Sequence, residues 1–317
     1  MKTLLNIIEH GWGTLAASLL LLVATSANLT AAEIPAEIPP ASTEFSCPAG
    51  LVPTTPTSAP SPLVLEVKTP RHRERSCFVT ADIVAKQTKS GSVTLVDVRL
   101  AEDFEKFRIP GALNIPLHLL KTKSFLKTAN IVLVNEGRSS RDLEESCRAL
   151  KQAGFSRVSI LDGGLHAWHE RKQPVEGDPL VSRSFNKLKT SELFFERAYD
   201  DWVAINLSAA SGPDSRQALK ALPRKVVTLK TAGKTVPTTE IRNAIRAQRL
   251  ANPNAKIAII ADTDAIYSKL EQELRGSEYV GVFYLAGGLA AYQQHVAMQV
   301  AIRHEADKPA KLASCRG

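Results

Sequence analysis

A buried strand, a tight loop and a helix follow one another within residues 131–152. The apolar residues 131–134 are typical of a buried strand, and Gly137 marks a turn in the polar loop after it. Residues 142–152 carry apolar side chains at helical spacing, and Gly154 ends the helix. This order aims backbone N–H groups and the positive end of a helix dipole at one point. It predicts a cradle for an anion or a thiolate.

The loop has the donors of such a cradle but contains no cysteine. Its residues are Asn135, Glu136, Gly137, Arg138, Ser139, Ser140 and Arg141. We expect Arg138 and Arg141 to flank the bound anion, whereas the carboxylate of Glu136 opposes it. The loop is therefore predicted to bind a small oxyanion such as sulfate weakly, or to dock the carboxylate of a partner protein.

The motifs around this loop resemble the rhodanese (sulfurtransferase) family over about residues 78–176. They are the strand ending in Asp97 and Arg99, the segment 108–116, the central strand and loop, and the strand before Gly163 and Gly164. The resemblance implies a parallel sheet flanked by helices and sulfur transfer through a cysteine persulfide. The family has a cysteine directly after the central strand. Here that position falls on Asn135, or on Glu136 if the loop is aligned one residue later.

Two further charged residues belong to the same pattern. Asp97 and Arg99 are expected to have a structural role, in which they pair with groups beneath the loop. No catalytic residue, cofactor or metal ion is predicted for this chain. Neither this loop nor its counterpart at 261–265 contains a thiol, and no histidine lies near Asp262 and Asp264, the paired carboxylates of that second loop, in sequence.

The same plan recurs, more diverged, in the second half of the chain. The repeated segments are 202–208, 221–229, 256–260 and 282–292. Gly287 and Gly288, with a leucine and an aromatic residue beside them, repeat the earlier glycine pair. The cysteine position of this half falls on Ala261 or Asp262. We predict a degenerate second rhodanese-like domain; the alternative is an unrelated small α/β domain.

The predicted fold class is therefore α/β, with two rhodanese-like domains that each have a central parallel sheet flanked by helices. The predicted strands are 93–98, 131–134, 158–161, 202–206, 256–260 and 282–285. The predicted divisions of the chain are a signal peptide (1–32), a Pro/Ala/Thr/Ser-rich linker (33–70), the first domain (71–178), the second domain (185–303) and a charged tail (304–317).

The N-terminal segment has the pattern of a secretory signal peptide. Lys2 supplies a positive charge, residues 15–24 form a short apolar core, and small residues lead to Ala32. We expect cleavage near Ala32, a periplasmic or secreted mature protein, and no membrane span after cleavage. The alternative is an uncleaved membrane anchor.

The basic residues that give a net charge of +8 are scattered along the chain. They form one notable cluster, residues 71–75, and the charge is interpreted mainly as a solvated surface. We therefore expect no nucleic-acid partner. An unknown envelope or periplasmic protein is the expected partner instead.

Four cysteines in an exported chain allow three pairings. Cys47 and Cys77 bracket a Pro-rich segment, and we predict a disulfide between them. Cys147 lies on the apolar face of a predicted helix and is expected to be a free buried thiol.

These patterns predict a non-catalytic binding or regulatory module. One alternative is a sulfurtransferase or sulfur carrier that uses a cysteine outside the usual loop position. The other is a structural subunit of an envelope complex, attached through the linker at 33–70.

Overall fold

A computed structural model describes residues 67, 69–230 and 238–306 of the chain. All of them belong to one compact unit, residues 58–317. The predicted signal peptide, most of the predicted linker and tail, Cys47 and Cys315 lie outside the described residues. Within the described part, no helix combines the length and the apolar character needed to cross a membrane.

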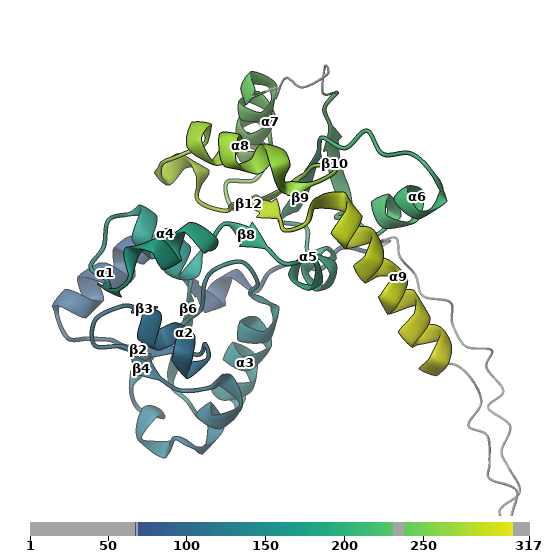
Figure 1. The fold of residues 1–317 in the computed structure, drawn as a ribbon. Helices are drawn as coiled ribbons and strands as arrows, with labels where there is room; N and C mark the ends of the chain where they lie inside the picture. The colour runs from purple at the N-terminus through teal and green to yellow at the C-terminus, as the bar shows by residue number, and fades with distance from the viewer. Residues whose placement is uncertain (1–66, 68, 231–237, 307–317) are drawn as a thin grey trace, which may run out of the picture. The chain divides into compact units, whose positions relative to one another are not determined.

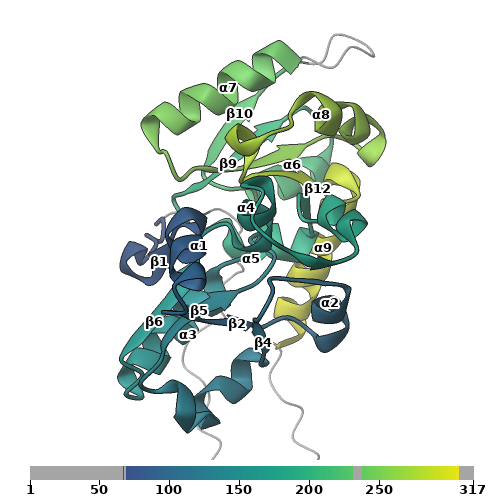
Figure 2. The ribbon, with the colours of Figure 1, turned by 90° about the vertical axis from the view of Figure 1, so that its left-hand side faces the viewer.

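The first half of the unit (Figure 1) is built on a five-stranded parallel sheet, whose strands lie in the spatial order β4-β2-β5-β6-β1 (Figure 2). Its strands are β1 (Phe78–Val79), β2 (Thr94–Asp97), β4 (Leu113–Asn114), β5 (Asn130–Val134) and β6 (Arg157–Leu161). Its helices are α1 (Ala81–Lys89), α2 (Ala101–Lys106), α3 (Arg141–Gln152) and α4 (Gly164–Glu170). A two-stranded antiparallel ribbon joins β3 (Phe107–Arg108) to β7 (Glu176–Gly177).

Helices cover both faces of this sheet because its central strands are apolar on both sides. Val132 and Val134 face α1 and α4, where Trp168 fills the core. Ile131 and Leu133 face α3 on the other side. Alternate residues of one strand therefore belong to two separate hydrophobic clusters, as a sheet buried on both faces requires.

The second half is built on another five-stranded parallel sheet, with the order β10-β9-β11-β12-β8. Its strands are β8 (Lys187–Leu188), β9 (Trp202–Asn206), β10 (Lys225–Thr228), β11 (Lys256–Ile260) and β12 (Val282–Leu285). Its helices are α5 (Thr190–Glu196), α6 (Pro213–Lys220), α7 (Thr238–Ala251), α8 (Tyr267–Glu273) and α9 (Gly288–Ala306). Helices α5, α6 and α9 cover one face of the sheet, and α7 and α8 cover the other (Figure 2).

The two sheets have the same connectivity. Numbered along the chain within each half, the strands lie in the spatial order 3-2-4-5-1. The predicted α/β class with two parallel, helix-flanked sheets is confirmed. The predicted strands 202–206, 256–260 and 282–285 coincide with β9, β11 and β12, and the other three differ by at most one residue at an end.

Candidate functional site

The loop between β5 and α3 turns sharply at Gly137. This residue has a φ of 101°, which favours glycine, and a Cβ atom there would overlap the carbonyl oxygen of Gly163. Asn135 braces the turn from within. Its Oδ1 accepts from the Gly137 N–H at 2.9 Å, and its Nδ2 donates to the Ser139 carbonyl at 2.6 Å. The side chain directly after the strand therefore stabilises the loop.

The donors at the start of α3 converge on one oxygen atom, Oε1 of Glu196, at the end of α5. The N–H groups of Ser140 and Arg141 donate to it at 2.9 and 2.8 Å, and the hydroxyl of Ser139 donates at 2.8 Å. A carboxylate is favoured here because the first N–H groups of a helix have no partner within it. The N–H groups that the sequence predicts to bind an anion therefore surround a carboxylate of the same chain.

Glu196 is completely buried, and its charge is stabilised from several directions. Its Oε2 accepts from Arg73 and from the indole Nε1 of Trp202, the latter at 3.2 Å. Burial by itself would raise the pKa of Glu196, but the charges of Arg73 and Lys256 and the hydrogen bonds from Arg73 and Arg141 outweigh it and lower the pKa to about 2. Glu196 is therefore an anion at neutral pH.

Arg73 lies at the centre of a buried group of carboxylates. Its Nε donates to Asp201 at 2.9 Å, its Nη1 lies 3.5 Å from Glu144, and its guanidinium lies 3.5 Å above the ring of Tyr199. Its side chain is 2% exposed, so the expected solvation of the basic cluster is wrong at this residue. A buried guanidinium needs such partners because an unpaired charge in the interior costs several kcal/mol, roughly 3–5.

Lys256, the first residue of β11, binds the other side of the loop. Its Nζ donates to Ser140 Oγ at 2.9 Å and lies 3.4 Å from the carbonyl oxygens of Gly137 and Arg138. Burial and the nearby charge of Arg73 lower the pKa of Lys256, and Glu196 opposes this. The second half thus contributes an anion to the N–H groups of the loop and an amine to its carbonyl groups.

The guanidinium groups of Arg138 and Arg141 pair with other carboxylates than Glu196, although both were expected to flank the anion bound at the loop. The Nε of Arg138 lies 3.1 and 3.0 Å from the two carboxylate oxygens of Glu192, one turn before Glu196 on α5. Its Nη2 also lies 3.8 Å from Glu136. The side chain of Arg141 is 35% exposed, and its Nε lies 3.3 Å from Glu145. The donors that the loop itself provides to Glu196 are therefore two backbone N–H groups and one hydroxyl.

Asp97 and Arg99 form a buried pair at the end of β2. The closest contact is 2.7 Å between Arg99 Nη2 and Asp97 Oδ2, and the same Nη2 donates to the carbonyl of Phe107 at 2.5 Å. Burial raises the pKa of Asp97 although Arg99 pulls it down. The pair fastens the segment containing α2 and β3 to the sheet.

The predicted pairing of Cys47 with Cys77 is wrong, because Cys77 forms a disulfide with Cys147. The prediction of a free thiol at Cys147 is wrong for the same reason. The Cα atoms are 6.5 Å apart, and both residues are buried between the start of the domain and α3. The sequence spacing favoured the nearer cysteine, whereas the fold brings together two residues 70 positions apart.

The loop after β11 in the second half corresponds to the loop between β5 and α3, but its side chains and contacts differ. Ala261 is buried after β11, and Asp262 is exposed and accepts hydrogen bonds from the Ser208 hydroxyl and, at 3.4 Å, the Ala209 N–H. No cysteine or arginine is present in residues 261–265. Nowhere in the described ranges do three or more His, Cys, Asp or Glu side chains gather in a way that could hold a metal ion.

Sequence reasoning missed the residues that complete the site. Glu196, Arg73 and Lys256 are far from the loop in sequence, and their residue types are usually exposed. One signal was available: Glu192 and Glu196 stand four positions apart, on one face of α5. Nothing in the sequence indicates which loop that face contacts.

Comparison with known proteins places this loop in a family. Residues 80–171 match the model of the Rhodanese-like domain. A "Sulfurtransferase" of Allochromatium vinosum is 33% identical over 85 residues, which are 26% of this chain and 78% of that protein. The chain belongs to the rhodanese-like domain family.

Other similarities cover the same region. The "HTH-type transcriptional regulator Rv0324" of Mycobacterium tuberculosis is 33% identical over 105 residues, 32% of this chain and 46% of that protein. The chain also matches the solution structure of the rhodanese-like domain of the Alr3790 protein from Anabaena, with 28% sequence identity and a TM-score of 0.29. The match covers 32% of this chain and 80% of the Anabaena domain. This rhodanese-like chain therefore spans most of one relative and about half of another.

Proposed function

We propose that this protein is a non-catalytic rhodanese-like binding module, in which the loop of the sulfurtransferase site binds a carboxylate of the second half. One observation carries the proposal: Glu196 Oε1 accepts from Ser139, Ser140 and Arg141 at 2.8–2.9 Å. A persulfide site needs these donors to stabilise a thiolate. Here they already bind an anion, and the residue after the strand is Asn135.

The alternative, sulfur transfer through another cysteine, is supported by the name of the Allochromatium relative. The disulfide argues against it for the cysteines within the fold. Cys77 and Cys147 are bonded to each other and are 1% and 0% exposed, so neither offers a thiolate to a substrate. Cys47 and Cys315 are the remaining candidates.

The second half is proposed to be a diverged copy of the first. Both sheets have the strand order 3-2-4-5-1. The N–H of Leu165 donates to the Asn135 carbonyl at 2.8 Å, and the N–H of Leu289 donates to the Ala261 carbonyl at 2.7 Å. In each half, therefore, the helix after the glycine pair bonds to the residue that follows the central strand.

Export to the periplasm is part of the proposal. The signal-peptide pattern of residues 1–32 supports it, and so does the disulfide between Cys77 and Cys147, because disulfides persist in oxidising compartments. The partner is proposed to be an envelope or periplasmic protein. A small oxyanion would have to displace Glu196 from the loop, so solution anions are proposed to bind there only weakly.

The deciding experiment is a thiosulfate:cyanide sulfurtransferase assay of the mature chain, with an active rhodanese measured alongside. We expect no turnover above background, with or without a reductant. Turnover at an ordinary enzyme rate would refute the proposal, and its loss in Cys47→Ser or Cys315→Ser would identify the nucleophile. Cross-linking in periplasmic extract then tests the binding role, and a partner recovered with the wild type is the expected result.

A further inference from the structure

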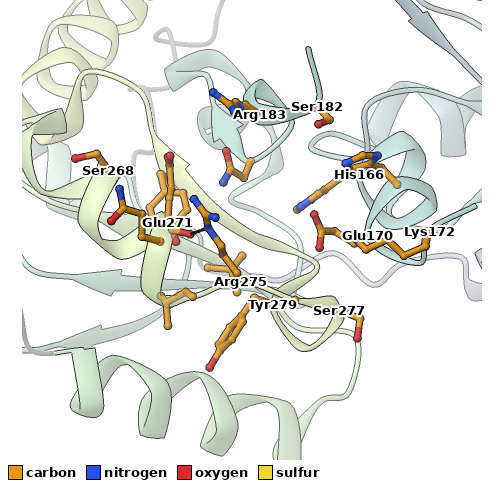
Figure 3. Close-up of a pocket in the computed structure, with 17 residues that line it drawn as sticks. His166, Glu170, Lys172, Ser182, Arg183, Ser268, Glu271, Arg275, Ser277 and Tyr279 are labelled. Atoms are coloured by element: carbon orange, nitrogen blue, oxygen red, sulfur yellow. Dashed lines mark hydrogen bonds between the residues drawn. The ribbon is translucent and has the colours of Figure 1, made fainter. Parts of the chain in front are cut away.

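A groove of about 480 Å³ lies between α7 and the turn that precedes β12. Residues of these two segments line it: Arg242, Ile245, Arg246, Arg249, Leu250, Glu278 and Tyr279. Tyr279 also lines a larger cavity of about 850 Å³ (Figure 3). Neither α5 nor the 135–141 loop contributes to the groove, so the inference goes beyond the proposed function.

The three arginines of the groove form a row along one flank of α7. They stand at positions 242, 246 and 249, and residues three and four positions apart lie on the same side of a helix. Arg242 donates from Nη2 to the backbone carbonyl of Glu273 at 2.9 Å, and Arg249 donates from Nη2 to that of Val280. Because a carbonyl is a neutral partner, these bonds hold the guanidinium groups in place and leave their positive charge intact.

The groove belongs to the part of the sequence that carries the net charge. Residues 216–252 contain nine Lys or Arg and one acidic residue, Glu240, so this stretch by itself accounts for the net charge of +8. Glu240 stands two positions before Arg242 and therefore points to nearly the opposite side of α7. Within the described part of the chain, Glu278 is the one carboxylate that lines the groove. Such a concentration of positive charge attracts an anionic partner.

The strand β10 extends the positive surface beside α7. Its basic residues, and those next to its ends, are exposed: Arg224, Lys225 and Lys230. Val227 and Leu229 pack against the cluster that contains Ile241 and Ile245 of α7, so the two elements are neighbours (Figures 1 and 2). The positive surface therefore spans two adjoining elements, which suits an extended anionic partner better than a single small ion.

An apolar side chain protrudes beside the row of arginines. Leu250 is 81% exposed, more than any other large apolar residue in the described part of the chain. It stands one position after Arg249 and four after Arg246. An apolar side chain this exposed is favourably removed from water where a lipid phase is available. A helix flank that combines arginines with a protruding leucine, and has a tyrosine beside it, is typical of a surface that binds an anionic membrane.

We propose that α7 docks on an anionic phospholipid surface. Lipid phosphates would accept hydrogen bonds from Arg242, Arg246 and Arg249, and Leu250 would enter the boundary between the headgroups and the acyl chains. The arginines would attract the surface, and the leucine would add an apolar contact that a soluble anion cannot make.

Other anionic macromolecules fit the groove less well. Sites for single-stranded nucleic acid stack successive bases on several aromatic rings, and residues 216–252 contain no aromatic side chain. Specific protein interfaces depend on clusters of large anchors such as Trp and Tyr, and the groove has one aromatic ring, that of Tyr279. A lipid surface requires only the charges and the protruding leucine.

Sedimentation of the mature chain with lipid vesicles tests this. We expect binding to vesicles of phosphatidylcholine mixed with phosphatidylglycerol, and binding to vesicles of phosphatidylcholine alone that is at least about tenfold weaker. Added salt should weaken binding to the anionic vesicles, because it screens the charges. Polyglutamate tests an acidic protein as the occupant. At equal concentrations of carboxylate and lipid phosphate it should leave the protein on the vesicles, and complete displacement would overturn the proposal.

Arg246→Gln should weaken binding to the anionic vesicles about fivefold, the factor that corresponds to about 1 kcal/mol for each basic residue at a lipid surface. Arg148→Gln is the matched control, because Arg148 is an exposed arginine on α3 and its loss lowers the net charge equally. This control should change the affinity by less than about twofold.

Leu250→Ala should weaken binding several-fold, because it removes the apolar contact with the lipid. Leu100→Ala, at a leucine that is 67% exposed and lies outside the groove, should leave the affinity unchanged. Four results would each contradict the proposal: no binding to the anionic vesicles, equal binding to both kinds of vesicle, equal losses in Arg246→Gln and Arg148→Gln, or unchanged affinity in Leu250→Ala.

Discussion

The backbone nitrogen of Arg141 and the carboxylate of Glu196 lie 2.8 Å apart, and this contact joins the first turn of α3 to the last residue of α5. The two residues are 55 positions apart in the sequence. A helix N-terminus that could have bound a ligand from solution instead binds a buried side chain of the second half. The stability of the chain and the state of the loop are consequently coupled.

Glu196→Gln should strongly destabilise the protein. The substitution keeps the shape but leaves the buried charges of Arg73 and Lys256 without their central carboxylate. We expect the free energy of unfolding to fall by about 3–5 kcal/mol. Urea unfolding followed by tryptophan fluorescence measures this. Glu145→Gln is the control, because within the described part of the chain that exposed carboxylate pairs only with Arg141. Its cost should stay below about 0.5 kcal/mol. Equal losses in the two variants would contradict the assigned role.

The contribution of Glu196 should depend on pH in a defined window. Its pKa is lowered from 4.5 to about 2 in the folded state, so the folded protein binds fewer protons than the unfolded chain between these values. The stability it provides is fully present above pH 4.5 and is lost as the pH falls through 4.5 to about 2, by about 3 kcal/mol in total. Unfolding free energies of wild type and Glu196→Gln should therefore converge across this window. If the difference in unfolding free energy between the two proteins stayed constant from pH 4.5 to about 2, the pH dependence assigned to Glu196 would be wrong.

Breaking the disulfide should destabilise the first half. The bond closes a loop of about 70 residues, for which the chain-entropy relation gives about 4 kcal/mol. We expect Cys147→Ala to lower the free energy of unfolding by about this amount under oxidising conditions, and peptide mapping without reduction to link Cys77 to Cys147. Cys47→Ser serves as the control. If it lowered stability as much as Cys147→Ala, the pairing described here would be wrong.

Gly137→Ala should lower the free energy of unfolding far more than the same substitution at Gly91. A methyl group at Gly137 would overlap the backbone of Gly163, and the loss should be at least about 3 kcal/mol. Gly91 also has a positive φ, 64°, but its Cβ would meet nothing within 4 Å. Gly91→Ala should therefore cost only the conformational strain, about 1 kcal/mol. Thermal unfolding of both variants compares the two, and similar midpoints would show that the loop does not pack as described.

The sequence by itself determined the framework of the fold. In β9, β11 and β12, runs of four or five buried residues make the strands recognisable, because a strand buried on both faces needs a continuous apolar segment. The loop after β5 and the glycine pair at Gly163 and Gly164 were also recognisable, since their backbone shapes favour particular residue types. The two-residue strands β1, β4 and β8 are too short to produce such a pattern.

Only the tertiary structure decided what the loop binds and which cysteines pair. The contacts of Glu196 with Arg141 and of Cys77 with Cys147 join residues 55 and 70 positions apart, and local sequence patterns carry no information on such distances. Charged residues such as Arg73 look the same in sequence whether they are solvated or buried. Their state depends on whether folding brings an opposite charge and hydrogen-bond partners to the same buried point, and that is a property of the packed structure.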